Sequence, residues 1–367
     1  MAKSVHPNAA QVNNGVAMMH ESAIARRDFF YAGGAYVGPP GEEVMHGQMY
    51  VERLTPREPR RPYPLVMFHG MGQTATNWLG TPDGRPGWAE HFAAEGYTVY
   101  LVDQPARGRS AWQPKHDGEL ASFAAAFQEW LFTASAADPR WPQAVKHTQW
   151  PGAGKRGDPV FDAFHATQVP FLADQVETQR LIRAAGAALL DRIGPAVLMT
   201  HSQSGTFGWI LGDARPQLVK AIVALEPAGP PFENTLPFAG KARIWGVADL
   251  PLAYDPPAAS PDDLALEQQE EPDGTDLVRC RQQTAPARRL VNLAGMPVLI
   301  LTGEASYHAV YDHCTAKYLT AAGVDVTFLR LEERGIYGNG HMLMLENNSD
   351  EIAAVVADWL RQALPGV

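Results

Sequence analysis

The sequence predicts an α/β protein in which a mostly parallel central sheet is covered by helices on both faces. Short β-type runs alternate along the chain with helical stretches, which is the pattern of such a sheet. Most of these runs are apolar throughout, as in strands buried on both faces. With 46% hydrophobic and 19% charged residues among 367, the chain can build a core and lacks the composition of a disordered protein.

The expected elements of this sheet follow one another from residue 48 onward. Gln48–Leu54 alternates like an antiparallel edge strand. Apolar runs predict further strands at Leu65–His69, Thr98–Asp103, Ala196–Thr200, Ala221–Leu225, Val298–Thr302 and Val326–Leu331. Apolar residues three and four apart predict helices at Trp88–Glu95, Gln179–Arg192, Ser204–Leu211, Val310–Ala322 and Ser349–Ala363.

The chain divides into a core and three other segments. Residues 1–30 are polar and aperiodic, so we expect an N-terminal arm there. The core is expected at residues 31–110 and 178–367, with insertions that are far longer than a usual connection. The aromatic-rich insertion 111–177 is interpreted as a cap over a cleft, or else as the core of a small extra subdomain. The second insertion, 228–294, is rich in proline and then acidic, and shows no recognisable chemistry.

Charge and hydropathy exclude several partners. The formal charge is 30 − 40 = −10, and no run of five Lys or Arg offers a phosphate-binding surface, so we expect no nucleic-acid partner. No apolar stretch is long enough for a membrane helix, and the residues through Arg27 lack the apolar block of a signal peptide, which predicts a cytoplasmic protein without a membrane partner. Cys280 and Cys314 are too few for a disulfide framework or a thiolate zinc site. Whether they pair, and whether the chain forms a homodimer, stays open.

The stretch from Val197 to Gly205 predicts a strand, a tight turn and a helix. A serine in such a turn is exposed, and the next backbone N–H at a helix N-terminus points to the same place, so Ser202 is the candidate nucleophile. The usual pattern is G-x-S-x-G, whereas Thr200 and Ser204 occupy the glycine positions here. A helix cap is one alternative reading of these serines. Ser204 as the nucleophile is another, although it would already lie in the helix.

A serine nucleophile needs a histidine base that a carboxylate orients. His341 is the candidate base, because it lies in a Gly-rich loop after the last strand, at the sheet edge where Ser202 is expected. Four other histidines compete for this role: His69, His201, His308 and His313. His69 and His201 are interpreted as packing or neighbouring residues, and His308 and His313 follow the strand Val298–Thr302. No third ligand is in register with the last two, so we expect neither a metal nor another cofactor.

Two glutamates compete for the role of the acid. In most proteins of this architecture the acid follows the strand before the last one, where this chain offers Glu304 but has a serine at the more usual position. Glu226 ends the neighbouring strand, where a carboxylate is costly to bury without a partner, and is preferred. The oxyanion hole needs two donors, which we assign to the backbone N–H groups of Gln203 and Met71.

These motifs resemble the α/β-hydrolase superfamily. His69-Gly70-Met71-Gly72 matches its oxyanion loop, and Asp103–Ser110 resembles its D-x-P-G-x-G-x-S turn. More narrowly, the chain is similar to a small group of bacterial esterases with an H-S-Q-S-G turn, here His201–Gly205, and a Glu acid after the sixth strand. The resemblance implies an α/β-hydrolase fold with inserted cap segments and a triad of Ser202, His341 and Glu226. Some members of that group carry two adjacent cysteines where this chain has Met71 and Gly72.

The resulting hypothesis is a serine hydrolase that cleaves a carboxylic ester or lactone through an acyl-enzyme. The aromatic residues of the expected cap favour a small apolar or aromatic ester as the substrate. Acyl transfer to an acceptor other than water would use the same triad. A ligand-binding protein on a hydrolase scaffold is the alternative from another class.

Overall fold

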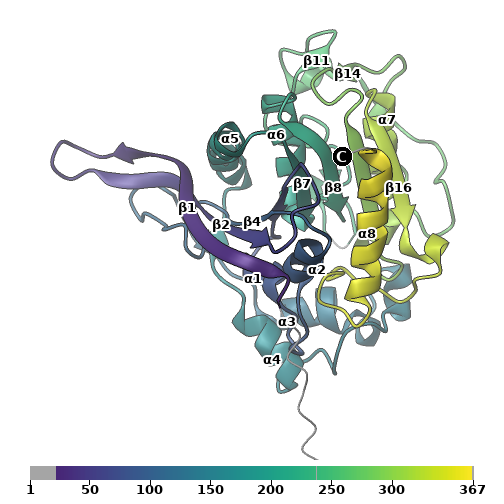
Figure 1. The fold of residues 1–367 in the computed structure, drawn as a ribbon. Helices are drawn as coiled ribbons and strands as arrows, with labels where there is room; N and C mark the ends of the chain where they lie inside the picture. The colour runs from purple at the N-terminus through teal and green to yellow at the C-terminus, as the bar shows by residue number, and fades with distance from the viewer. Residues whose placement is uncertain (1–21, 237, 366–367) are drawn as a thin grey trace, which may run out of the picture.

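A computed structural model describes residues 22–236 and 238–365, and its centre is a mixed sheet of eight strands (Figure 1). From β4 to β16 all neighbours are parallel, while β2 is antiparallel to β1 and to β4. The strands are, in spatial order, β1 (Ile24–Val37), β2 (Val44–Pro56), β4 (Val99–Asp103), β3 (Leu65–Phe68), β7 (Ala196–His201), β8 (Val219–Leu225), β15 (Pro297–Thr302) and β16 (Asp325–Arg330).

Strand β1 corrects two expectations. The predicted N-terminal arm, residues 1–30, extends too far, because Ile24–Val37 is a strand that pairs with β2; residues 1–21 lie outside the described part. Gln48–Leu54 is therefore an inner strand and not an edge strand. The sequence of β1 shows no alternation of apolar and polar residues, because most of its side chains are exposed. Strand β1 is therefore held largely by its backbone pairing with β2. The two strands run beyond the sheet as a projecting hairpin (Figure 1).

Helices cover both faces of the sheet and bury two separate cores. Helices α2 (Trp88–Ala94) and α8 (Ser349–Ala363) pack on one face, and α5 (Gln175–Ile193), α6 (Gly205–Ala214) and α7 (Asp312–Ala321) pack on the other. Successive residues of a strand point to opposite faces, so Met67 belongs to the first core and Val66 to the second. The short helix α1 (Thr76–Leu79) precedes α2.

The segment 111–177 contains short elements and a dense set of aromatic side chains. Its elements are β5 (Leu120–Ala121), α3 (Ala125–Gln128), the π-helical turn η1 (Glu129–Thr133), the 3-10 turns η2 (Ser135–Ala137) and η3 (Pro142–Lys146), α4 (Pro159–Ala166) and β6 (Phe171–Leu172). Phe123 packs on Phe127 and Phe171, and Phe127 also contacts Phe238 of the second insertion. The two insertions therefore meet through aromatic contacts.

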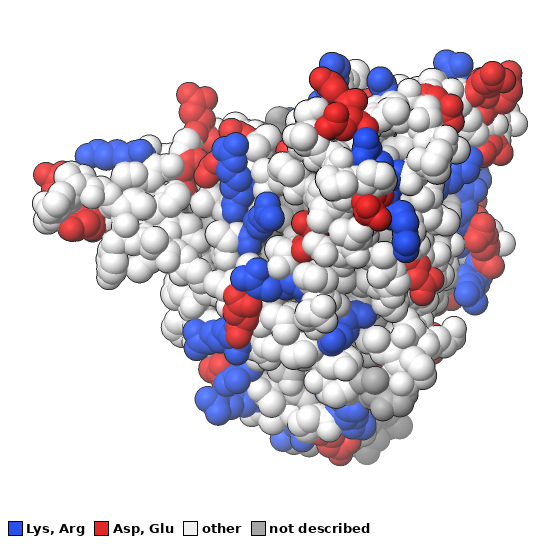
Figure 2. Space-filling view, turned by 90° about the horizontal axis from the view of Figure 1, so that it is seen from above, with Lys and Arg blue, Asp and Glu red and all other residues white. Residues whose placement is uncertain are grey.

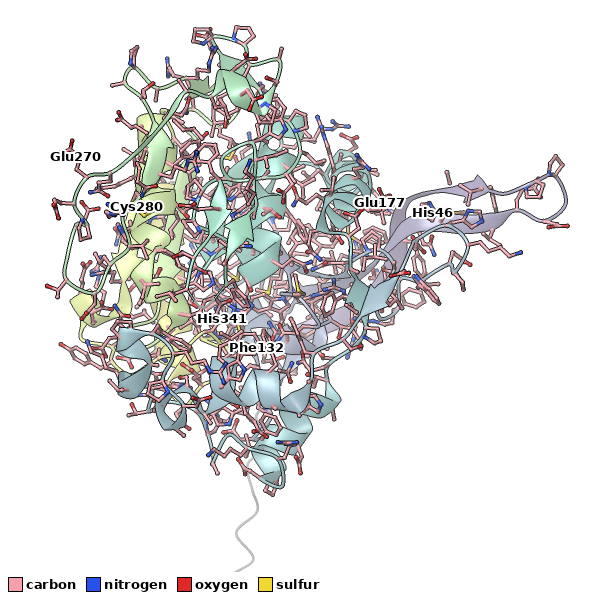
Figure 3. The ribbon with its side chains drawn as sticks, turned by 180° about the vertical axis from the view of Figure 1, so that it is seen from behind. His46, Phe132, Glu177, Glu270, Cys280 and His341 are labelled. Carbon is pink, nitrogen blue, oxygen red and sulfur yellow. A yellow bond between two sulfur atoms is a disulfide. The ribbon has the colours of Figure 1, made fainter. Side chains whose placement is uncertain are left out.

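The segment 228–294 is built from small two-stranded sheets and turns. They pair β9 (Glu233–Asn234) with β10 (Gly240–Lys241), β11 (Tyr254–Asp255) with β14 (Arg289–Leu290), and β12 (Leu266–Gln268) with β13 (Arg281–Gln283). A disulfide joins Cys280 of this segment to Cys314 of α7, which answers the question of their pairing (Figure 3). This covalent link fastens the insertion to the core.

The distribution of surface charge and the length of the helices are relevant to nucleic-acid and membrane partners. On the face seen from above, acidic and basic side chains are interspersed (Figure 2). Among residues 22–236 and 238–365, every helix is too short or too polar to span a bilayer.

Candidate active site

Ser202 lies in the turn between β7 and α6 with a left-handed backbone, at φ +58°. Such a conformation costs a non-glycine residue about 1–3 kcal/mol and is concentrated at functional sites. The position in this turn that requires a glycine is Gly205, because a Cβ there would collide with Pro227. This explains why Ser204 is tolerated at a glycine position of the motif. Its hydroxyl is buried, donates to Phe68 O at 2.9 Å and accepts from His201 N at 2.8 Å.

Glu226 and His341 form a buried pair. The carboxylate of Glu226, at the end of β8, lies 2.5 Å from His341 Nδ1 and accepts from Gly303 N at 2.7 Å and Ser306 Oγ at 2.6 Å. Glu304 is not brought to His341. Its carboxylate instead contacts Lys146 Nζ at 2.9 Å. Of the two glutamates considered, only Glu226 meets His341.

Burial sets the protonation of this pair. It lowers the pKa of His341 well below its usual value, and the neighbouring His201 and His308 act in the same direction. His341 is therefore neutral at ordinary pH, which is the form that can accept a proton. Burial raises the pKa of Glu226, as does the charge of Asp312, and the hydrogen bonds from Ser306 and Gly303 oppose the rise.

A cavity of about 460 Å³ has both Ser202 and His341 in its wall. Much of the rest of the wall is aromatic and comes from the two insertions and from the segment before α7. These side chains are Phe123, Phe127, Phe132, Phe238, Tyr307 and Tyr311. The ring of Phe132 stacks on that of His341 with centroids 5.3 Å apart (Figure 3). Residues of segment 111–177 thus contact the histidine directly.

The loop that contains Met71 and the residue after Ser202 both line the cavity. Arg107, which is buried, donates to Gly70 O at 3.1 Å and to Gln203 Oε1 at 3.3 Å. Burial lowers the pKa of Arg107 to about 9, so it still carries its charge near neutral pH. Arg107 therefore ties together the two segments that carry the expected oxyanion donors.

The other histidines are accounted for by buried contacts. His201 Nε2 lies 3.0 Å from His341 O, and His308 Nδ1 lies 2.9 Å from Asp312 Oδ1. His69 Nδ1 lies 2.9 Å from Gly70 O. Burial lowers the pKa of both His69 and His201 to about 3. His313 lies beside Asp273, with its Nε2 3.5 Å from the carboxylate.

Two groups of potential metal ligands occur among the described residues, and neither is well suited to a metal. In one, His313 lies beside Cys280 and Cys314, whose disulfide leaves no thiolate. In the other, His308 joins Glu226 and His341, which are already hydrogen-bonded to each other.

The sequence reasoning missed Tyr307 and the role of Ser306. Tyr307 Oη lies 3.4 Å from His341 Nε2. Burial raises the pKa of Tyr307, as does the charge of Glu226, and a side-chain hydrogen bond with Ser202 opposes the rise. The tyrosine thus contacts both side chains of the expected Ser–His pair. The only sequence feature that could have predicted the contact between Ser306 and Glu226 is that a serine occupies the usual position of the acid.

The sequence profile of the alpha/beta hydrolase family matches residues 65–355. The chain belongs to this family. It is similar to the protein named "Probable secreted lipase phiG" of Fungal sp. (strain ATCC 74256), with 49% identity over 353 residues, 94% of this chain and 93% of that protein. This hydrolase also resembles the solved structure of a novel bacterial esterase, with a TM-score of 0.64 and 24% identity over 94% of this chain and 97% of that one. The expected fold class is confirmed.

Proposed function

We propose that this hydrolase cleaves a carboxylic ester through an acyl-enzyme, with Ser202 as nucleophile, His341 as base and Glu226 as the acid that orients His341. One observation carries the proposal. Ser202 has a left-handed backbone in the wall of the same cavity as His341, whose Nδ1 lies 2.5 Å from a buried Glu226 carboxylate. A nucleophile, a base and an orienting carboxylate in this order are the requirements for acyl transfer.

In the first half of the reaction, Ser202 Oγ attacks the ester carbonyl carbon and its proton passes to His341 Nε2. The tetrahedral oxyanion accepts hydrogen bonds from Met71 N–H and Gln203 N–H, and Glu226 stabilises the imidazolium. The C–O bond to the leaving group then breaks, and His341 returns the proton to the departing alkoxide. The products are an alcohol and an acyl-Ser202.

In the second half, a water molecule attacks the acyl carbon and gives a proton to His341 Nε2. Collapse of this second tetrahedral intermediate breaks the bond to Ser202 Oγ, which takes the proton back. A carboxylic acid leaves, and the free hydroxyl is restored. A lactone would follow the same steps, with alcohol and acid on one product molecule.

The aromatic wall of the cavity supports a small, largely apolar or aromatic ester as substrate. We propose that residues 111–177 act as the cap, because Phe132 stacks on His341 and Phe123 and Phe127 line the cavity. The core is then 31–110 and 178–367, interrupted by the insertion 228–294.

Two further assignments belong to this proposal. The His201–Gly205 turn and the Glu226 acid support membership of the esterase group with an H-S-Q-S-G turn. In place of the expected cytoplasmic location we propose secretion, since disulfides persist in oxidising compartments and the fungal relative is named as secreted.

A fluorophosphonate probe tests the proposal, because it reacts rapidly with the activated serine of a serine hydrolase. We expect rapid stoichiometric labelling of wild type, its loss in Ser202→Ala, and full labelling of Ser22→Ala as a matched control on the surface. Turnover of aryl esters, alkyl esters and lactones then defines the substrate. Absence of labelling in folded wild type would instead support a ligand-binding protein, and acyl transfer to added alcohols with little hydrolysis would support an acyltransferase.

A further inference from the structure

Three charged side chains line the cavity that contains Ser202: Lys241, Arg243 and Asp249. All three come from the insertion 228–294. Together they carry a formal charge of 2 − 1 = +1, whereas the whole chain carries −10. The other lining residues are apolar, neutral polar or histidine. Hydrolysis of an apolar ester makes no use of this positive charge.

Arg243 is the most buried of the three, with 7% of its surface exposed. Its Nε donates to Pro230 O at 2.8 Å, and its Nη2 donates to Glu233 O at 2.5 Å and to Asn234 Oδ1 at 2.9 Å. All of these acceptors are neutral. Within residues 22–236 and 238–365, Nη1 has no hydrogen-bond acceptor and no carboxylate lies within 4.0 Å of the guanidinium.

A guanidinium in this position is costly unless it meets an anion, because burial removes its water while Asp249 supplies opposite charge only from beyond 4.0 Å. The two N–H groups of Nη1 are the donors that remain for the carboxylate of a ligand. The backbone of Arg243 is left-handed, at φ +49°, a strain that is typical of ligand-binding positions. These features indicate a cation that is held in place for a bound group.

The remaining two charges fit the same interpretation. Lys241 is exposed, and among the described residues it forms no ion pair. Asp249 is partly satisfied by protein, because its Oδ2 accepts a hydrogen bond from Gln179 Nε2 at 2.9 Å. The cavity therefore offers an anion one buried and one exposed cation, opposed by a single carboxylate that is already engaged.

We propose that the substrate is an ester that carries a carboxylate remote from the scissile bond, and that Arg243 and Lys241 bind this carboxylate. This inference rests on the proposed function and deepens it by naming the substrate class. In this arrangement the ester carbonyl lies at Ser202, the carboxylate lies at Arg243 Nη1, and the aromatic wall contacts the chain between them. Monoesters of dicarboxylic acids have this chemistry.

Binding to full-length Ser202→Ala tests the inference without requiring turnover. The probes are monomethyl adipate, the neutral compound in which an amide replaces its free acid, and the analogue with a phosphonate at the same end. By calorimetry we expect the acid to bind at least about tenfold more tightly than the amide, with an affinity that falls as salt is added. Equal affinities for the acid and the amide would overturn the proposal. A tenfold preference for the phosphonate over the carboxylate would overturn the choice of a carboxylate and would indicate a phosphate-type group on the substrate.

Variants locate the binding group. In the Ser202→Ala background, Lys241→Met should lower the preference for the acid several-fold and Arg243→Met should abolish it. Lys155→Met, an exposed lysine outside the cavity lining, is the matched control and should keep the preference. If Arg243→Met fails to fold, Lys241→Met and the salt dependence still decide. An unchanged preference for the acid in Lys241→Met, together with no salt dependence, would refute the assignment. Failure of the ester hydrolase proposal would be seen separately, as missing fluorophosphonate labelling of wild type.

Discussion

Ser306 Oγ donates a hydrogen bond of 2.6 Å to Glu226 Oε2. The two residues follow neighbouring parallel strands, β15 and β8, so their side chains meet at the same sheet edge. A serine thus stands at the position where the acid is usually found, and it holds Glu226, the proposed acid, which comes from the next strand. The same Glu226 oxygen contacts His341 Nδ1, so the carboxylate links Ser306 to the proposed base.

Ser306→Ala should lower kcat/KM by about tenfold to a hundredfold, since a hydrogen bond to a charged group contributes about 1.5–3 kcal/mol. Removing the donor leaves the carboxylate more basic and favours the imidazolium, so the acidic limb of the kcat/KM profile should move to higher pH. Ser306→Thr keeps the hydroxyl and should restore both rate and profile. A slower enzyme with an unshifted pH profile would mean that Ser306 is only structural.

Glu226→Gln should reduce kcat by about 10²–10⁴, because an amide supports the wrong tautomer of His341 and cannot stabilise its protonated form. Glu304→Gln is the matched control and should stay near wild type, since Glu304 contacts Lys146 and not His341. Steady-state kinetics on one aryl ester with both variants checks this. A large loss in Glu304→Gln with a mild effect in Glu226→Gln would assign the acid to Glu304.

Acid should destabilise this fold below pH 6.5. The pKa of His69 and of His201 is about 3 in the folded protein because burial penalises the charged ring, whereas an exposed histidine titrates near 6.5. Between these values the unfolded chain binds protons that the folded chain does not, so the free energy of unfolding is largest above pH 6.5 and falls as the pH decreases toward 3. Urea unfolding at several pH values measures the slope, and His201→Gln should make it shallower. Identical slopes in both proteins would contradict this cause.

Loss of the Cys280–Cys314 disulfide should destabilise the protein. The bond closes a loop with a sequence separation of 34, for which the chain-entropy relation gives about 4 kcal/mol as an upper value. The double variant Cys280→Ser with Cys314→Ser avoids a free thiol, and its Tm should fall and become insensitive to dithiothreitol. Wild type in dithiothreitol should approach the Tm of the variant. No difference in Tm between oxidised wild type and the variant would show that the link adds no stability.

Local sequence determined the inner strands of the central sheet and the turn at Ser202. The apolar runs Leu65–His69 and Ala196–Thr200 can satisfy their side chains only in the interior of a sheet, so their places were predictable within a residue. The turn at Ser202 was predictable as well, because a strand followed at once by small polar residues and a helix leaves few conformations. Strand β1 was missed because its side chains stay largely exposed and leave no periodic signal.

Only the tertiary structure decided which distant groups meet. Sequence reasoning weighed Glu226 against Glu304, and the strand register brings Glu226 to His341 while Glu304 turns to Lys146. Arg243 had no signal at all in an insertion without recognisable chemistry, and its significance appears only when the cavity and its neutral partners are seen together. The physical reason is range. Hydrophobic periodicity is a property of neighbouring residues, whereas the cavity brings Arg243 of the insertion together with Ser202 and His341, which are far from it and from each other in the chain.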